Sequence, residues 1–167
     1  MLTVIDTQFA DAKLIVPDVF ADRRGYFKET FSTGKYAAVG IHDEWLQDAV
    51  SRSGRNVLRG LHYDLRMAKL VQVLQGVAFD VIVDMRDGSP TFKRWQSFEL
   101  TGDNHRQIYV PKGFAHGFLA QSEIVIFHYK MSALYDAAQE RLLKWNDPSV
   151  GVDWPLDGPP ILSGKDA

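Results

Sequence analysis

Residues 70–84 read LVQVLQGVAFDVIVD. Branched and aromatic residues dominate both halves of this stretch, which is typical of β-strands. From Val77 to Asp84 the chain has the two-residue period of a strand. Val77, Phe79, Val81 and Val83 alternate with Ala78, Asp80, Ile82 and Asp84. The Gln75-Gly76 pair between the halves is a turn signal. The stretch therefore predicts two strands, over 70–74 and 77–84, joined by a tight turn.

The rest of the chain extends this pattern in both directions. Further strand-like runs cover 95–100, 107–110, 118–120 and 123–130, and turn signals separate them at 87–90, 101–104 and 111–113. Many short strands at such spacing favour an all-β sandwich or barrel. Only 32–39 and 135–143 have a helical pattern. We expect one all-β domain over 1–167 with a few short helices.

The composition excludes several classes of function. The chain has 167 residues, 46% of them hydrophobic, a formal net charge of -2 and no cysteine. Disulfides, zinc–thiolate sites and a cysteine nucleophile are therefore excluded. The balanced charge gives no reason to expect nucleic acid or an anionic membrane as a partner. Residues 1–13 do not read as a signal peptide, and no apolar run reaches the roughly 18 residues of a membrane span. A cytoplasmic protein is expected.

The motif Arg59-Gly60-Leu61-His62 contains the first candidate catalytic residue, His62. Arg59 and Lys69 place cations on both sides of His62, which suits an anionic ligand. A histidine in such a setting can act as a general base near neutral pH. The alternative is a structural histidine bonded to a carbonyl, which is the commoner role of a lone histidine.

The motif Pro111-Lys112-Gly113-Phe114-Ala115-His116 resembles the second sequence motif of the cupin superfamily. In metal-binding cupins, the first motif supplies two histidines one residue apart and then a glutamate. Here Asp64 stands at the second histidine position, and Lys69 lies where the glutamate would fall. Because an ammonium repels a cation, we expect a cupin-type jelly-roll barrel without a metal. His116 is open to either a structural or a site role.

Tyr129 follows His128 in a predicted strand, so the two side chains face opposite sides of the sheet. If Tyr129 points into the barrel, then His128 points out. Packing in the core is the commoner role of a strand tyrosine. Only the presence of the other motifs in the same chain favours a catalytic role.

Taken together, these motifs resemble the dTDP-4-dehydrorhamnose 3,5-epimerase family of sugar-nucleotide cupins. The matching stretches run in order along nearly the whole chain. They are residues 22–29 (DRRGYFKE), 47–48, 57–62, 69–71, 79–81, 88–92, 111–118, 129–130, 145–148 and 161–166 (ILSGKD).

The resemblance implies a role for each matching residue. His62 resembles the catalytic base, Asp166 its orienting carboxylate, Tyr129 the acid on the opposite face of the sugar, and Lys69 the cation beside the sugar carbonyl oxygen. The substrate-contacting positions of the family fall on Arg24, Glu29, Gln47, Arg59, His116, Glu140 and Lys165. The family also implies a homodimer in which residues such as Arg24 and Glu29 approach the partner's pocket.

The implied reaction is epimerisation at C3, C5 or both of a nucleotide-diphosphate-linked 4-keto-6-deoxy sugar, in rhamnose-type deoxysugar biosynthesis. Hydrogens beside a ketone are acidic, and a nearby cation stabilises the enolate, so no cofactor is needed. Ala49 stands where the commonest pattern has asparagine, and the 63–68 segment is short, as in relatives that act on other nucleotide sugars, including GDP-linked heptoses. A 3,4-ketoisomerase and a non-catalytic sugar-binding cupin are the alternatives.

Overall fold

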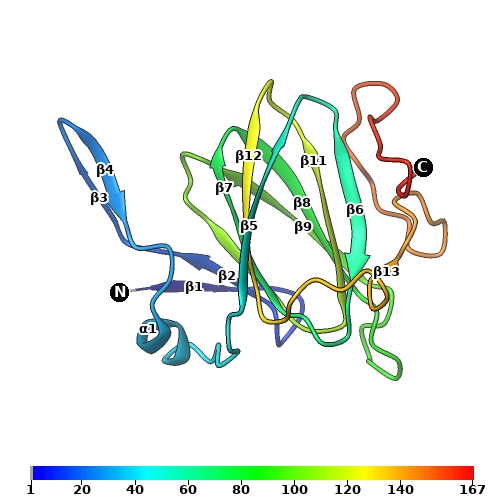
Figure 1. The fold of residues 1–167 in the computed structure, drawn as a ribbon, viewed down its shortest axis with the longest axis horizontal. Coiled ribbons are helices and arrows are strands. Elements are labelled where there is room, and N and C mark those ends of the chain that lie inside the picture. The colour runs from blue at the N-terminus through cyan, green and yellow to red at the C-terminus, as the bar shows by residue number, and fades with distance from the viewer. Residues whose placement is uncertain (1) are drawn as a thin grey trace.

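The turn at Gln75-Gly76 carries the chain from one β-sheet to another. The computed structural model describes residues 2–167, and in it β7 (Lys69–Gln75) and β8 (Val77–Asp84) belong to different sheets (Figure 1). Gly76 has φ +89°, and a side chain there would collide with the carbonyl oxygen of Ile124. A glycine is therefore required where the chain changes sheets.

The first sheet has six antiparallel strands in the order β1-β2-β10-β7-β12-β5. Their bounds are Thr3–Asp6 for β1, Lys13–Val16 for β2, Gln107–Val110 for β10, Val125–Met131 for β12 and Gln47–Ser53 for β5.

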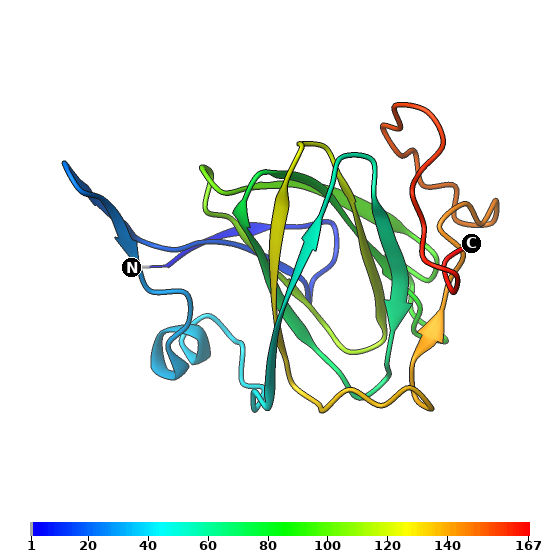
Figure 2. The ribbon, with the colours of Figure 1, turned by 45° about the horizontal axis from the view of Figure 1, so that its top comes forward.

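The second sheet has five antiparallel strands in the order β13-β6-β11-β8-β9. Its further members are β13 (Arg141–Leu142), β6 (Leu58–Tyr63), β11 (Phe114–Ala120) and β9 (Trp95–Thr101). A separate hairpin of β3 (Val19–Asp22) and β4 (Gly25–Lys28) extends away from both sheets (Figures 1 and 2).

Three apolar clusters hold these elements together. The largest lies between the sheets and includes Val71, Ile82 and Phe127. A second cluster buries the outer face of the five-stranded sheet under residues 143–162, and a third seats α1 (Thr33–Ala37) beside the six-stranded sheet. Strand β8 is buried on both faces, because Ile82 faces the first cluster and Val81 the second.

The two facing sheets confirm the predicted all-β, cupin-type jelly roll, and the strands expected after residue 70 are all present. The short helix expected over 32–39 is confirmed as α1. The helix expected over 135–143 is wrong. Asp136 caps a single turn by accepting hydrogen bonds from the backbone N–H groups of Ala138 and Glu140, and the chain then pairs as β13 with β6. Hydrogen bonding to an open sheet edge outweighs the helical pattern of this segment.

The only helix among residues 2–167 is α1, and no helix in this range has the length and apolar character needed to span a bilayer.

Candidate active site

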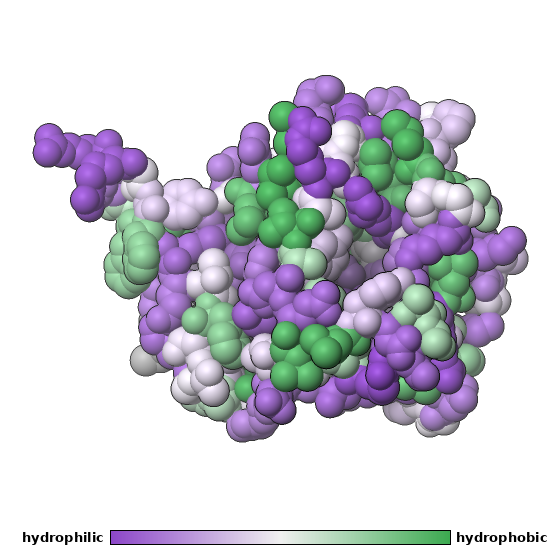
Figure 3. Space-filling view, in the orientation of Figure 1, coloured by the Kyte–Doolittle hydropathy of each residue, from purple (hydrophilic) through white to green (hydrophobic). Residues whose placement is uncertain are grey.

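A cavity of about 370 Å³ is lined by side chains from both sheets. The surface is hollowed in the middle of the face shown in Figure 3. Strands β5, β7 and β12 form one wall, β6 forms the facing wall, and the segments 135–140 and 163–166 close the rim. The cavity therefore lies at the open end of the barrel, above the apolar core.

The register of the six-stranded sheet places its side chains in rows across this wall. Gln47, Met131 and Lys69 form one row, and Ala49, Tyr129 and Val71 form the next. Alternate residues face the same side of a strand. Lys69 and Tyr129 therefore enter the same cavity from neighbouring rows. His128 lies on the other face, near Gln72 and Asp48, as expected if Tyr129 points inward.

On the facing wall an irregularity in β6 brings Arg59 and His62 to the same side. Strand β11 opposes Arg59 with Phe118 but opposes His62 with His116, so β6 has one extra residue between these pairs. Gly60 sits in this bulge with φ +120°, and a Cβ there would lie 2.7 Å from the Cα of Gly117. Only glycine permits both that dihedral and that close approach.

His62 pairs with a carboxylate from the far end of the chain. Its Nε2 lies 2.5 Å from Oδ1 of Asp166, which is 5% exposed and accepts a second hydrogen bond from the Ser163 hydroxyl. Burial lowers the pKa of His62, and the Asp166 carboxylate opposes that shift. Because Asp166 occupies Nε2, Nδ1 is the nitrogen left for proton transfer.

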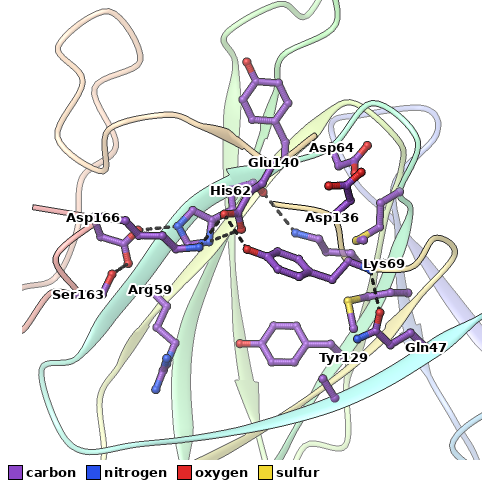
Figure 4. A pocket seen from close by; sticks show the side chains of 16 residues that line it. Gln47, Arg59, His62, Asp64, Lys69, Tyr129, Asp136, Glu140, Ser163 and Asp166 are labelled. Carbon is purple, nitrogen blue, oxygen red and sulfur yellow. Dashed lines mark hydrogen bonds and ion pairs between the residues drawn. The ribbon is translucent and has the colours of Figure 1, made fainter. Parts of the chain in front are cut away.

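Lys69 supplies a cation in the middle of the cavity (Figure 4). Its Nζ donates a hydrogen bond to the backbone carbonyl of His62 at 3.3 Å. Burial lowers the pKa of Lys69 to about 8, against the opposing effect of Glu140, Asp80 and Asp64. A group with this pKa stays mostly charged at neutral pH and can stabilise an oxyanion.

Tyr129 lies across the cavity from His62 (Figure 4). Its ring packs against the core at Phe127, with 4.9 Å between ring centroids, and its hydroxyl is 3.2 Å from Oγ of Ser51. Burial raises the pKa of Tyr129 to about 12, which keeps the phenol protonated at neutral pH. A protonated phenol and an imidazole thus face each other from opposite walls.

Charged groups surround this pair at the rim. Glu140 lies 3.8 Å from Nδ1 of His62 and binds Lys165 at 2.7 Å. Arg59 donates a hydrogen bond from Nε to the Ser53 hydroxyl at 2.9 Å while the residue stays exposed. The amide oxygen of Gln47 accepts a hydrogen bond from the backbone of Tyr135. Two cations therefore stand near the mouth, where an anionic group would enter.

Comparison with known proteins decides which family this site belongs to. A sequence profile of the dTDP-4-dehydrorhamnose 3,5-epimerase family matches residues 6–167. The chain belongs to this family. The enzyme of that name from Pseudomonas aeruginosa is 46% identical over 159 residues, which are 93% of this chain and 88% of that protein. The Neisseria gonorrhoeae enzyme is 44% identical over 99% of this chain, and the chain spans about half of its length, 51%.

A solved member of the family has nearly the same fold. The dTDP-6-deoxy-D-glucose-3,5-epimerase of Legionella pneumophila, crystallised with dTDP-4-keto-L-rhamnose, is 44% identical and superposes with a TM-score of 0.97. The match covers 99% of this chain and 90% of that one.

The structure brings together eight of the eleven residues that the family resemblance singles out. They line the cavity and are Gln47, Arg59, His62, Lys69, Tyr129, Glu140, Lys165 and Asp166. His116 does not line it. It is 4% exposed, and its Nε2 lies 2.7 Å from Oδ2 of the fully buried Asp80, behind the ring of Tyr129.

Arg24 and Glu29 also lie outside the cavity of their own chain. Arg24 is at the tip of the β3–β4 hairpin, where it pairs with Asp22, and Glu29 pairs with Lys35 next to α1. The side chain of Arg24 is 84% exposed. Within one chain of this epimerase family member, neither residue reaches His62.

The sequence motifs missed other residues that line the cavity. They are Ala49, Tyr63, Asp64, Met67, Met131, Tyr135, Asp136 and Ser163. Several come from the segments 64–67 and 135–136 outside the strands, whose course depends on tertiary pairing. The sequence marks Ala49 only as a departure from the family pattern. The alternation of Gln47, Ala49 and Ser51 along β5 is the signal that could have placed it on the face of Tyr129.

Among residues 2–167 no three or more histidine or acidic side chains gather closely enough to hold a metal ion. Both histidines near the cavity are engaged, His62 with Asp166 and His116 with Asp80.

Proposed function

We propose that this chain epimerises a dTDP-linked 4-keto-6-deoxy sugar at C3 and C5. One observation carries the proposal: a carboxylate-bound imidazole and a protonated phenol face each other across one cavity, with a buried ammonium between them. Inverting a carbon requires a proton to leave one face and another to arrive at the opposite face. The arrangement of His62 and Tyr129 meets this requirement.

In the proposed reaction, Nδ1 of His62 removes the hydrogen from a carbon next to the C4 ketone. Asp166 stabilises the imidazolium that forms, as a carboxylate does in other acid–base dyads. The electrons move into an enolate whose oxygen lies near Lys69, where the ammonium offsets the new charge. Tyr129 then donates its phenolic proton to the opposite face of the same carbon.

The cations at the mouth suit a diphosphate. The planar guanidinium of Arg59 matches phosphate oxygens in a bidentate manner, and Lys165 adds a mobile point charge. Lys165 is bound to Glu140 in this structure, so a phosphate would compete for it and free Glu140 beside His62. We place His116 behind the wall, where it supports the Tyr129 ring rather than touching the sugar.

We also propose that the functional form is a homodimer. The β3–β4 hairpin extends from the body (Figures 1 and 3). Phe20 and Phe27 on it are 64% and 70% exposed. Exposed apolar surface on a projecting hairpin fits an interface with another protein. If the hairpin rests on a second copy, Arg24 and Glu29 can reach the partner's cavity.

The decisive experiment follows sugar hydrogens by NMR in D₂O with dTDP-, GDP-, CDP- and UDP-linked 4-keto-6-deoxy sugars. We expect deuterium at C3 and C5 of the dTDP sugar with inversion, and no exchange in His62→Ala. Migration of the ketone to C3 would indicate a ketoisomerase, and binding without exchange would indicate a non-catalytic cupin.

The variant Tyr129→Phe separates the two proton transfers. The ring still packs against Phe127, so the fold should persist. Exchange should survive in part because His62, Asp166 and Lys69 remain, while inversion should fall by roughly 10²–10⁴-fold, the scale of a lost general acid. Equal loss of exchange and inversion would show that the hydroxyl acts before the enolate forms.

A further inference from the structure

Strand β5 presents a polar side chain to Tyr129 that none of the roles above uses. The residues of β5 that face inward alternate from Gln47 through Ala49 and Ser51 to Ser53. Ser51 lies one row below Tyr129, and its Oγ is 3.2 Å from the phenolic oxygen. The ring packs against the core cluster and also lines the cavity, and among residues 2–167 the Ser51 hydroxyl is the hydrogen-bond partner of the phenol.

Ser51 also has a position that differs from that of the other site residues. It does not belong to the lining of the cavity, yet the residue is partly exposed. Strand β5 is the outermost strand of its sheet and has β12 as its one strand neighbour. Ser51 therefore stands on an edge strand, is partly exposed to solvent, and contacts the phenol of Tyr129 without lining the cavity itself.

A double inversion makes such a contact useful. After the first inversion Tyr129 is a phenolate, and the sugar still fills the space in front of it. A second inversion needs a protonated phenol again. Water cannot reach the phenolate through an occupied cavity, so the proton must return by another path or the sugar must leave.

We propose that Ser51 is a positioning residue that returns a proton to Tyr129 between the two inversions while the sugar stays bound. The O–H bond of Tyr129 breaks when its proton goes to the sugar carbon. The O–H bond of Ser51 then breaks as its proton moves to the phenolate, and Oγ of Ser51 takes a proton from solvent water. The proton that His62 removed from the carbon leaves by way of Glu140, 3.8 Å from Nδ1 at the rim, and neutralises the hydroxide that the water left in solvent, so the balance closes. This inference rests on the proposed epimerase function.

The test uses Ser51→Ala with dTDP-linked 4-keto-6-deoxy-D-glucose and enzyme in excess over sugar. Quenched samples are analysed by NMR for singly and doubly inverted sugar. We expect the first inversion to keep a rate within about threefold of the wild type, because Tyr129 starts protonated. The second inversion should slow by roughly 10–100-fold, on the scale of impaired proton transfer. The singly inverted sugar should therefore accumulate and be released.

Two further variants complete the design. Ser51→Thr keeps a hydroxyl at the same place and should restore the doubly inverted product. Ser53→Ala, two residues along the same face, loses the bond to Arg59 instead. It should raise KM without changing the ratio of singly to doubly inverted sugar.

The outcomes separate the two proposals. If Ser51→Ala leaves both inversions unchanged, or slows both equally with the same product ratio, Ser51 only supports the ring and the relay is overturned. A wild-type enzyme that inverts one centre overturns the relay as well, since no second proton is needed. A wild-type enzyme that exchanges no sugar hydrogen overturns the epimerase function itself.

Discussion

The two nitrogens of His62 have different surroundings, and this difference sets its chemistry. Nε2 contacts the buried carboxylate of Asp166, whereas Nδ1 faces the cavity with Glu140 at 3.8 Å. Burial alone would leave a weak base with a lowered pKa, and Asp166 recovers part of the lost basicity. The carboxylate thus fixes both the orientation of the ring and its readiness to accept a proton.

Replacing Asp166 by asparagine tests this at the single-residue level. Asp166→Asn keeps the size of the side chain but removes the charge that stabilises the imidazolium. Exchange of the sugar hydrogens should fall by roughly 10²–10⁴-fold. Because the carboxylate raises the pKa of His62, the acid limb of the rate should also move to lower pH. Ser163→Ala, which removes one hydrogen bond to Asp166, should cost far less; equal losses in the two variants would contradict a role for the charge.

The loss of charge on Lys69 should set the alkaline side of the pH–rate profile. In the proposed reaction its ammonium stabilises the enolate, and burial lowers its pKa to about 8. The charged form exists below that pH and is lost above it, so kcat/KM for exchange should decline as pH rises through about 8. The acid limb should lie below the usual imidazole range because the pKa of His62 is lowered. In Lys69→Arg any residual activity should lack the limb near pH 8. A limb that persists there would belong to another group.

These residues could be predicted from the sequence because each lies in a short local motif, and the motifs occur together in the order that the family shows. His62 follows Arg59-Gly60, and Lys165-Asp166 ends a matching stretch. The sequence could not predict the neighbours that depend on sheet register. Asp80 behind His116 and Ser51 behind Tyr129 are placed by strand pairing. Asp80 lies in the matching stretch 79–81 but no role was predicted for it, and Ser51 belongs to no matching stretch.

At the scale of the element, β6 decides the geometry of one wall. A regular strand would turn Arg59 and His62 to opposite faces, because they are three residues apart. The bulge at Gly60 adds one residue, and both side chains enter the cavity. Sequence periodicity cannot reveal this, because a bulge breaks the period, although the glycine marks where it occurs.

Gly60→Ala should therefore damage both fold and activity. The backbone at φ +120° costs a residue with a side chain about 1–3 kcal/mol, and the contact with Gly117 adds to it. The free energy of unfolding, measured in urea, should fall by at least this amount, and activity should be lost. Gly25→Ala is a matched control, since Gly25 has φ +123° with nothing within 4 Å of its Cβ position. A loss no larger than in Gly25→Ala would mean that the approach of β6 to β11 does not matter.

The 135–143 segment is an element whose secondary structure could not be predicted from its own sequence. Its residues have a helical pattern, but β6 offers an edge, and the backbone of Leu143 exchanges two hydrogen bonds with Leu61. This pairing holds Glu140 over the cavity. The strands after residue 70 were predictable because branched and aromatic residues between turn signals mark them locally. The conformation of this segment instead depends on pairing with β6, which is far away in sequence.

At the scale of the whole molecule, the C-terminal segment packs on its own chain, whereas the N-terminal hairpin projects from it. Residues 143–162 cover the outer face of the five-stranded sheet and are tied to β6 through Ile161, whose backbone bonds Asn56 and Leu58. This returns Asp166 to His62 across 104 positions. The hairpin near the other end, by contrast, extends from its own chain (Figure 2).

The hairpin yields the last prediction. Phe20 and Phe27 pair across β3 and β4, and a two-stranded hairpin with two exposed aromatic rings is poorly stabilised without a further partner. If a second copy covers them, the double variant Phe20→Asp/Phe27→Asp should place charges in that interface and separate the subunits. Light scattering at micromolar concentration should then show a fall from twice 18.9 kDa to 18.9 kDa.

The activity of the separated subunits gives the same prediction a second readout. His62, Lys69 and Tyr129 all come from one chain, so some exchange should persist, but KM should rise because Arg24 can no longer reach a partner's cavity. Arg24→Ala should raise KM while leaving the mass of the dimer unchanged. Phe92→Asp is the control for adding a charge, since Phe92 is 41% exposed in a loop distant in sequence from the hairpin. A wild-type monomer with full activity would contradict the prediction, because the cavity would then be complete within one chain.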